Sequence, residues 1–282
     1  GREPKGRGVT CGVWLVTGGT SGLGLRIGQW LVEHGGAKRV VLASRSGGGG
    51  RATADAALLA ELVQRGVARV VRVDVSDRAA VQRVVGECGD DLRGVVHAAA
   101  AMADEALSDI QPSSWRRVVG SKGDAAVWLS EAVGGRVASF VVVTSVSGVV
   151  GNVGQASYAA GNVMADGVVR DRRARGWAGV AVSLGAVRGA GMLAESALGE
   201  QMMAAGVGML EADEAVRAVC EAAVGDAGEA HVIVSRTAWT GEDGRFALVR
   251  TAASGTMKMS MEEARSAVVG AVAAAVRGVS VD

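Results

Sequence analysis

The sequence predicts an α/β fold, a doubly wound parallel sheet of about seven strands with helices on both faces. Three observations lead to this prediction. Short valine-rich runs alternate with longer segments of helical spacing along most of the 282 residues. A glycine-rich turn follows the first run and opens the first helical segment. Aromatic residues are only 3% of the chain and hydrophobic residues 49%, so small aliphatic side chains must fill the core, as they do between the layers of α/β proteins.

Each expected strand is a short apolar run, which is typical of parallel strands because helices cover both of their faces. The strands lie, in chain order, at Val13–Val16, Arg39–Ala43, Arg69–Val73, Gly94–His97, Phe140–Thr144, Val180–Ser183 and His231–Val234. The helices between them are expected at Gly22–His34, Thr53–Arg65, Arg78–Cys88, Ser113–Val133, Ala156–Arg175 and Ala212–Val224. Right-handed crossovers through these helices join the strands into one parallel sheet.

The extent of this alternation sets the expected domain boundaries. Residues 1–8 form a polar, basic leader without the apolar core of a signal peptide, and residues 9–236 form the α/β domain. Residues 237–261 are expected to be a linker and 262–282 an amphipathic C-terminal helix. A stretch rich in Met and Ala, residues 190–209, is interpreted as a helical lid over the site, with an ordinary helical excursion as the alternative.

Charge and cysteine content exclude several function classes. Lys plus Arg number 30 and Asp plus Glu 29, so the chain has no strong field to attract nucleic acid or an anionic membrane. The apolar run Ala267–Val276 is too short to span a bilayer and is bounded by Arg265 and Arg277. The three cysteines are widely spaced and show no metal-binding spacing, which predicts a reduced, cytoplasmic chain without a metal site.

A glycine motif, Thr17–Gly24, follows the first strand and opens the first helix. In this context Gly18 permits a tight turn, Gly22 lets the backbone approach a pyrophosphate, and Gly24 lets the helix pack against the strand. The N–H groups at the helix start attract phosphate, whereas the alternative is a glycine-rich turn without a ligand. The candidate cofactor-binding residues of the motif are Gly18, Thr20, Ser21, Gly22, Leu23 and Gly24.

The second strand ends in Ser44 and Arg45, where a site for NAD usually carries Asp or Glu to bind the ribose 2′-hydroxyl. An arginine and a serine at this point suit a 2′-phosphate instead, so the sequence favours NADP(H). The alternative is a solvent-exposed arginine at a strand end.

The third and fourth strands also end in candidate cofactor contacts. Asp74 and Val75 close the third strand, where the aspartate contacts the adenine edge or caps a helix. His97, Ala98 and Ala99 close the fourth strand, where a turn of small residues can lie beneath the ribose and nicotinamide. His97 itself is interpreted as structural rather than catalytic.

The candidate catalytic group contains the only tyrosine of the chain, Tyr158, thirteen residues after Ser145 at the end of the fifth strand. Asn162 lies four residues beyond the tyrosine and therefore on the same helix face. A phenol with a pKa of about 10 needs a nearby cation if it is to protonate a carbonyl near neutral pH. Lys122 is the lysine that the fold can bring beneath it, and a merely solvated lysine is the alternative.

These residues together resemble the short-chain dehydrogenase/reductase superfamily over roughly residues 9–236, which implies a Rossmann-type fold. A typical member carries lysine where Asn162 stands, and asparagine where Lys122 stands. That exchange resembles the ketoreductase domains of polyketide synthases and of related multifunctional fatty acid synthases. The segments Val95–Ala99 and Gly154–Asn162 add to the likeness.

The resemblance implies NADPH-dependent reduction of the β-ketone of an acyl chain held on an acyl carrier protein domain, in company with other synthase domains. It implies that Tyr158 donates the proton and that Ser145 hydrogen-bonds the ketone oxygen. Lys122 would bind the nicotinamide ribose and lower the pKa of the tyrosine, and Asn162 would position Lys122 or a relay water.

Three positions bear on the substrate side. Val150 stands where one stereochemical class carries tryptophan, and Met102–Asp104 stands where the opposite class carries Leu-Asp-Asp, so Asp104 alone is kept. This favours the D-configured hydroxyl. Met192 matches a frequent methionine of the family's lid.

The resemblance covers only the catalytic half of such a ketoreductase. The tail Glu262–Asp282 resembles the first helix of an acyl carrier domain, with an ordinary terminal helix as the alternative. Two other functions stay open at this point, which are a free-standing reductase of small carbonyl compounds and a non-catalytic nucleotide-binding scaffold.

Overall fold

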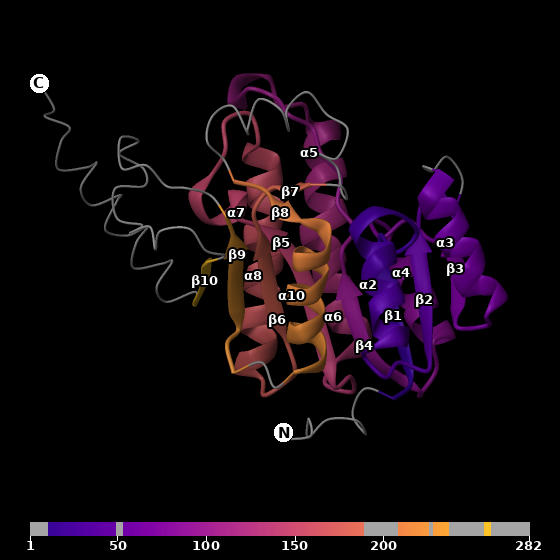
Figure 1. Ribbon diagram of the computed structural model, residues 1–282. Helices are drawn as coiled ribbons and strands as arrows, with labels where there is room; N and C mark the ends of the chain where they lie inside the picture. The colour runs from indigo at the N-terminus through magenta and orange to yellow at the C-terminus, as the bar shows by residue number, and fades with distance from the viewer. Residues whose placement is uncertain (1–10, 49–52, 189–207, 226–227, 237–256, 261–282) are drawn as a thin grey trace, which may run out of the picture.

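The computed structural model describes residues 11–48, 53–188, 208–225, 228–236 and 257–260 (Figure 1). The expected leader, the C-terminal helix, Met192 and nearly all of the expected lid lie outside the described residues.

The core of the molecule is one eight-stranded sheet in the order β10-β9-β6-β5-β4-β1-β2-β3. Seven strands are parallel, as the sequence predicts, and the last pairs antiparallel with β9. The strands are β1 (Val13–Thr17), β2 (Arg39–Ser44), β3 (Ala68–Arg72), β4 (Leu92–His97), β5 (Ser139–Ser145), β6 (Val180–Leu184), β9 (His231–Ser235) and β10 (Met257–Ser260). β10 falls within the range that we expected to be a linker, so that range contains at least one strand.

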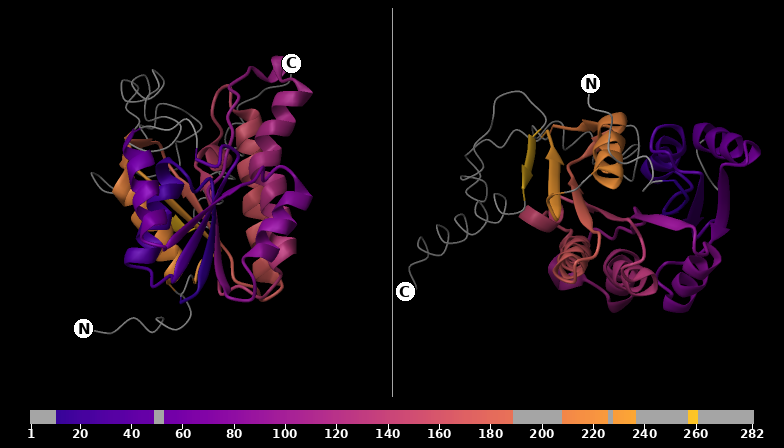
Figure 2. Two further views of the ribbon diagram at one scale, coloured as in Figure 1. Left: turned by 90° about the vertical axis from the view of Figure 1, so that its right-hand side faces the viewer. Right: turned by 90° about the horizontal axis from the view of Figure 1, so that it is seen from below.

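Helices cover both faces of this sheet (Figure 2). On one face lie α2 (Gly22–Glu33), α3 (Thr53–Gln64) and α10 (Ala212–Val224), and on the other α4 (Arg78–Glu87), α6 (Ala125–Val133) and α8 (Ala156–Ala174). All six correspond to helices expected from the sequence. The remaining short elements are η1 (Leu107–Asp109), α5 (Pro112–Val119), η2 (Gly120–Asp124), α7 (Ser147–Val150) and the two-stranded pair β7 (Val187–Arg188) and β8 (Leu210–Glu211).

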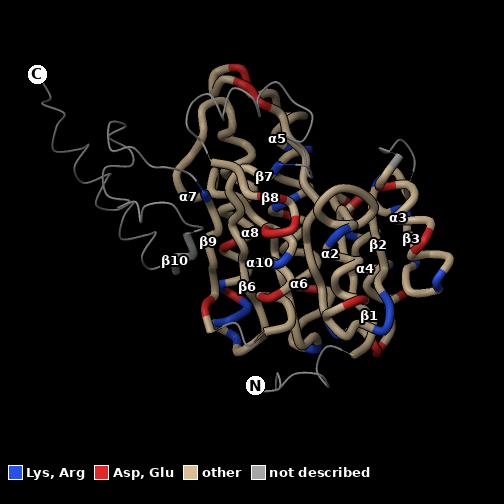
Figure 3. The backbone as a smooth tube through the Cα atoms, viewed as in Figure 1, with Lys and Arg blue, Asp and Glu red and all other residues tan. Residues whose placement is uncertain are grey.

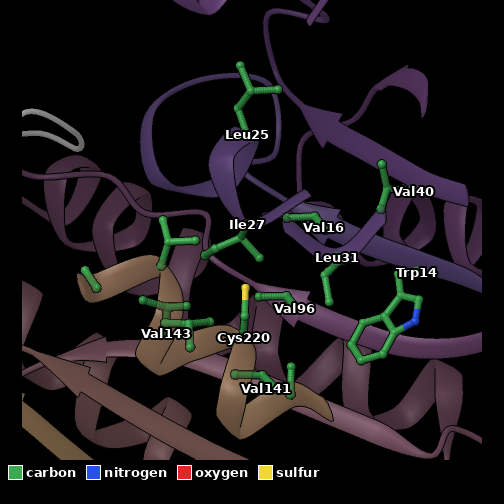
Figure 4. Close-up of a cluster of buried hydrophobic side chains, with 14 of the residues drawn as sticks. Trp14, Val16, Leu25, Ile27, Leu31, Val40, Val96, Val141, Val143 and Cys220 are labelled. Atoms are coloured by element: carbon green, nitrogen blue, oxygen red, sulfur yellow. The ribbon is translucent and has the colours of Figure 1, made fainter. Parts of the chain in front are cut away.

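The two hydrophobic cores follow from the alternation of side chains along the strands. Trp14 and Val16 of β1 face the core beneath α2 and α10, whereas Leu15 faces the opposite core (Figure 4). Gly94 of β4 pairs with Trp14, and a Cβ at Gly94 would lie 2.3 Å from the indole ring. The absence of a side chain at Gly94 therefore leaves room for Trp14, the largest side chain of this core. The indole fills volume that few other aromatic residues are present to fill.

One expected helix, residues 113–133, is interrupted by a change of helix type. Its path runs through α5, the single π-turn η2 and α6. π-turns within helices occur frequently at functional sites, and Lys122 lies in this one. The turn brings Lys122 towards α8, where a Cβ at Gly161 would lie only 3.4 Å from the Cβ of the lysine. A glycine at this crossing allows the two helices to approach closely.

Charged residues of both signs are interspersed over the outer helices and loops (Figure 3). Within the described ranges, no helix combines the length and apolarity that a membrane span requires. Nor do the described residues contain a group of three or more His, Cys, Asp or Glu side chains that could hold a metal ion.

Candidate active site

A cleft of about 850 Å³ lies along the carboxyl ends of the parallel strands, the upper edge of the sheet in Figure 1. Open α/β sheets bind ligands at this edge, at the point where the strand order reverses, here between β1 and β4. Most of the candidate residues meet on its wall. They are Gly18, Thr20, Ser21, Gly22, Leu23, Gly24, Ser44, Arg45, Asp74, Val75, Ala98, Ala99, Lys122, Ser145 and Tyr158.

The glycine loop forms a tight cradle at the start of α2. Gly18 has a φ of +67°, and a Cβ there would lie 2.9 Å from the backbone of Ala99. A Cβ at Gly24 would lie 2.3 Å from the carbonyl oxygen of Gly18. Any larger side chain would break this packing, so the loop holds backbone N–H groups at the helix N-terminus, where phosphate binds.

A carboxylate already occupies part of this cradle. The backbone N–H of Gly22 donates to Oδ2 of Asp55, from α3, at 2.7 Å. The N–H of Gly22, at the start of the helix, is thus paired with a negatively charged oxygen, as expected for a helix N-terminus. Asp55 was not predicted from the sequence, because it lies 33 positions after Gly22 and no local pattern indicates this contact.

The end of β2 is organised by hydrogen bonds around Ser44. Thr20 Oγ1 donates to Ser44 Oγ at 2.6 Å, and the N–H of Gly47 donates to the same oxygen at 3.2 Å. The Arg45 side chain is exposed at the mouth of the cleft, while its carbonyl oxygen accepts from Arg72 Nε at 3.0 Å. The backbone of Arg45 is thus held in place by Arg72, and its guanidinium group is exposed to solvent.

Asp74 folds the loop after β3. Its Oδ1 accepts from the N–H and the hydroxyl of Ser76, at 2.9 and 2.7 Å. Burial raises the pKa of Asp74, but the hydrogen bonds from Ser76 and the nearby charge of Arg45 outweigh it, so the pKa lies below its usual value. The cap of α4 is Asp77 and not Asp74, which leaves Asp74 on the cleft wall.

His97 lies behind the cleft. Its Nδ1 is 2.7 Å from Thr17 Oγ1, and its Nε2 is 3.0 Å from the carbonyl oxygen of Lys122. Burial, and then the charge of Lys122, lower the pKa of His97 to about 3, so the ring is neutral at physiological pH. The two contacts of His97 connect β1 to the π-turn, which is a structural role.

The phenol of Tyr158 lies in the cleft with Ser145 and Lys122. Burial raises the pKa of Tyr158 above its usual value, and side-chain hydrogen bonds with Asn162 and Ser145 work against this shift. Asn162 is fully buried, and its Nδ2 also donates to the carbonyl oxygen of Tyr158 at 2.8 Å. The asparagine therefore fixes the helical turn that carries the tyrosine.

Lys122 is 3% exposed, and its Nζ donates to the carbonyl oxygen of Val143 at 2.8 Å. Burial lowers the pKa of Lys122 to about 7, and the negative charge of Asp166 acts in the opposite direction. Asp166 follows Tyr158 and Asn162 on the same face of α8, at a spacing of four residues. The sequence analysis did not identify it.

Ser145 begins a chain of hydrogen bonds towards the substrate side. Its Oγ is 3.0 Å from the hydroxyl of Ser147, which donates to Gln155 Oε1 at 3.3 Å. Gln155 Nε2 in turn donates to Asp104 Oδ1 at 3.2 Å. Asp104 is thereby connected to the candidate catalytic serine, and its charge raises the pKa of Tyr158. Ser147 and Gln155 are further residues that the sequence analysis missed.

Three further candidates among the described residues do not line the cleft. Val150 ends α7 and, like Asp104 and Asn162, does not contribute to the cleft wall formed by the described residues. Met192 lies outside the described residues.

Comparison with known proteins gives a consistent result. The family model described as KR domain matches residues 12–189. The chain is 39% identical over 251 residues to polyketide synthase GfsA of Streptomyces halstedii, covering 86% of this chain and 3% of that protein. It is 36% identical over 187 residues to highly reducing polyketide synthase 40 of Fusarium mangiferae, covering 65% of this chain and 7% of that protein. The chain thus spans less than a tenth of these curated relatives.

Two solved structures resemble the fold over most of its length. One is PlmKR1, the ketoreductase from the first module of phoslactomycin biosynthesis in Streptomyces sp. HK803, with a TM-score of 0.73, 32% identity, and coverage of 81% of this chain and 53% of that one. The other is a structure of A-type ketoreductases from a modular polyketide synthase, with a TM-score of 0.74, 30% identity, and coverage of 93% and 54%.

Proposed function

The chain belongs to the KR domain family, and from this premise we propose that it reduces the β-keto group of an acyl-carrier-bound thioester to a β-hydroxyl group with NADPH. The observation that carries the proposal is the meeting of Tyr158, Ser145 and Lys122 on one wall of the cleft that also contains the glycine loop. A dinucleotide whose phosphates are held by the loop would share this cavity with the proton donor, and the volume of the cavity suits a cofactor and an acyl chain end.

The residues present fit the dinucleotide. The cradle at Gly18 and Gly24 leaves no room for side chains, and the N–H of Gly22 already binds a carboxylate oxygen. We assign the pyrophosphate to this N-terminus, and the 2′-phosphate to Ser44 and Arg45. The bound cofactor supplies a hydride to the carbonyl carbon.

The chain's own residues supply the proton and hold the ketone. Tyr158 gives its phenolic proton to the ketone oxygen as negative charge develops there. Ser145 donates a hydrogen bond to the same oxygen and stabilises that charge. We propose that Lys122, which lines the same cleft, offsets the effect of burial on the phenol, because a nearby ammonium group favours the phenolate. Asn162 keeps the tyrosine-bearing turn in place.

We propose that the product carries the D-configured hydroxyl. The support is Asp104, which reaches Ser145 through Gln155 and Ser147 and so stands at one end of the network that orients the ketone. The partner that presents the substrate is proposed to be an acyl carrier domain, with other synthase domains in the same assembly.

The decisive experiment is turnover of a β-ketoacyl thioester with NADPH, followed by chiral analysis of the alcohol. The Tyr158→Phe variant should lose about 100-fold or more of kcat, while fluorescence titration shows that NADPH still binds. A variant that keeps its turnover would remove Tyr158 as the proton donor. A preference for unrelated free ketones over a carrier-bound thioester would contradict the proposed substrate class.

A further inference from the structure

Four buried polar side chains behind Lys122 take no part in the steps described above. We call them the buried polar ring; they are Thr144 of β5, Asp166 of α8, Ser183 of β6 and His231 of β9. Their exposed fractions are 4, 3, 0 and 2%. A buried group of this kind lowers stability unless its members satisfy one another, so its place beside the active site calls for a functional reason.

The contacts of the ring are nearly continuous. Thr144 Oγ1 is 2.8 Å from Ser183 Oγ, which is 2.7 Å from His231 Nε2. His231 Nδ1 is 3.8 Å from Asp166 Oδ2, and Thr144 hydrogen-bonds the carboxyl group of Asp166. Strands β5, β6 and β9 lie side by side in the sheet, so these residues hold the carboxyl group against the sheet from below α8.

The ring touches the catalytic group at two points. Thr144 directly precedes Ser145 along β5. Asp166 lies one helical turn beyond Asn162 on the face of α8 that also carries Tyr158. Because Gly161 allows α8 to lie close against the π-turn, the carboxyl group is near enough to Lys122 for each to shift the pKa of the other.

Electrostatics gives the carboxyl group a role. Burial disfavours the charged form of Lys122, and the opposite charge of Asp166 favours it. Burial also raises the pKa of Asp166 to about 7, whereas the hydrogen bond from Thr144 and the charges of Arg170 and Lys122 act to keep the carboxyl group ionised. His97 and His231 are neutral at physiological pH, with pKa values lowered by burial to about 3 and about 4, and Arg170 is exposed.

Asp166 itself is not fully satisfied by hydrogen bonds. Its Oδ1 and the Nδ1 of His231 are buried without a hydrogen-bond partner among the described residues. Two buried polar atoms without hydrogen-bond partners lower the stability of the fold. This cost is explained if the carboxyl group serves as the counter-charge of the buried ammonium group of Lys122.

We propose that Asp166 is a positioning residue for Lys122, and that the buried polar ring fixes its carboxylate behind the lysine so that the ammonium group stays charged beneath the Tyr158 phenol. The inference rests on the proposed reduction. It adds a residue that touches neither substrate nor cofactor and acts through the lysine.

The test is the pH profile of kcat for the full chain and its Asp166→Asn variant, with a β-ketoacyl thioester and saturating NADPH. Loss of the carboxylate lowers the pKa of Lys122, so the lysine loses its charge at lower pH and activity falls earlier on the alkaline side. We expect the alkaline limb to move down by about one pH unit, which is about a tenfold loss of kcat on that limb, with KM nearly unchanged. Asp171→Asn is the matched control, because Asp171 is on the same helix but exposed and paired with Arg175.

A second variant keeps the test decisive if Asp166→Asn does not fold. Thr144→Val preserves the side-chain shape and removes the hydrogen bond that lowers the pKa of Asp166, so the limb should move in the same direction by a smaller amount. An unmoved limb, or a loss of kcat that is equal at every pH, overturns the role of Asp166. A wild-type chain that does not turn over the thioester overturns the proposed function as well, so the two failures are distinguishable.

Discussion

The two sides of the cleft are built in different ways. On the side of β1 and β2, the candidate cofactor contacts are backbone N–H groups and side chains on short loops, and Arg45 is open to solvent. On the side of β5 and α8, Lys122 and Asn162 are almost completely buried, and they donate to the backbone of β5 and of the preceding turn of α8, respectively. The first side suits a charged ligand that enters and leaves, and the second suits groups whose geometry must not change during a reaction.

This difference leads to a general expectation about mutations. Changes on the loop side should affect the affinity for the cofactor. There the protein supplies only the hydrogen-bond donors, and the phosphate groups of the cofactor supply the negative charge that they bind. Changes on the buried side should affect the rate at saturation, since there the protein itself supplies both members of each contact. Three substitutions, with successively smaller effects, test this division.

The largest effect is expected for Lys122→Met, which keeps the apolar stem of the side chain and removes the charge. Burial already raises the pKa of Tyr158, and the variant removes the ammonium group that we propose to favour the phenolate, so proton donation becomes slower. We expect kcat at saturating NADPH to fall by about 100-fold or more, measured by steady-state kinetics.

The control for this change is Lys38→Met, since Lys38 is exposed in the loop before β2. It should leave kcat unchanged. If Lys122→Met instead raised only the KM for NADPH, the lysine would belong with the binding side, and the division between the two sides would be wrong.

The next effect is expected on the loop side, for Arg45→Ala. A hydrogen-bonded charge pair between the guanidinium and a 2′-phosphate accounts for about a 10- to 100-fold difference in affinity. The Kd for NADPH should rise by that factor, the Kd for NADH should change little, and kcat at saturation should be retained. Fluorescence titration of both nucleotides measures the difference.

Arg39→Ala is the matched control, because Arg39 is an exposed arginine at the opposite end of the same strand. It should leave both affinities unchanged. Equal losses for NADPH and NADH in Arg45→Ala would contradict the assignment of the 2′-phosphate to Arg45.

The same division explains how much the sequence could predict. The seven parallel strands and six major helices follow from local periodicity, and the glycine loop and the Ser145–Tyr158 spacing are patterns within short segments. By contrast, Asp55 reaches Gly22 across 33 positions, and Ser183 and His231 meet across 48. Within a strand run, a polar residue such as Ser183 gives no sign of which distant residue it will contact.

Two elements were missed for a related reason. The π-turn η2 (Gly120–Asp124) lies within a longer helical segment, and its wider spacing serves contacts with α8 that the local sequence does not encode. The short strand β10 becomes a strand by pairing with the edge of the sheet at β9, so its identity depends on tertiary context rather than on its own pattern.

The smallest effect is expected at Asp104, which does not line the cleft and is connected to Ser145 through Gln155 and Ser147. Its charge raises the pKa of Tyr158, but the residue is exposed, so solvent screens the interaction. Asp104→Asn keeps an oxygen to accept from Gln155 and removes only the charge, so the pKa of Tyr158 should fall by about a few tenths of a pH unit. Because Tyr158 is the only tyrosine of the chain, the absorbance of tyrosinate reports this one group.

Asp109→Asn, an exposed change in the neighbouring η1, should leave that titration unchanged. A pKa that stays constant in Asp104→Asn would mean that Asp104 acts on the site only through its hydrogen bond to Gln155. A fall much larger than a few tenths would mean that solvent does not screen the charge of Asp104 from the phenol.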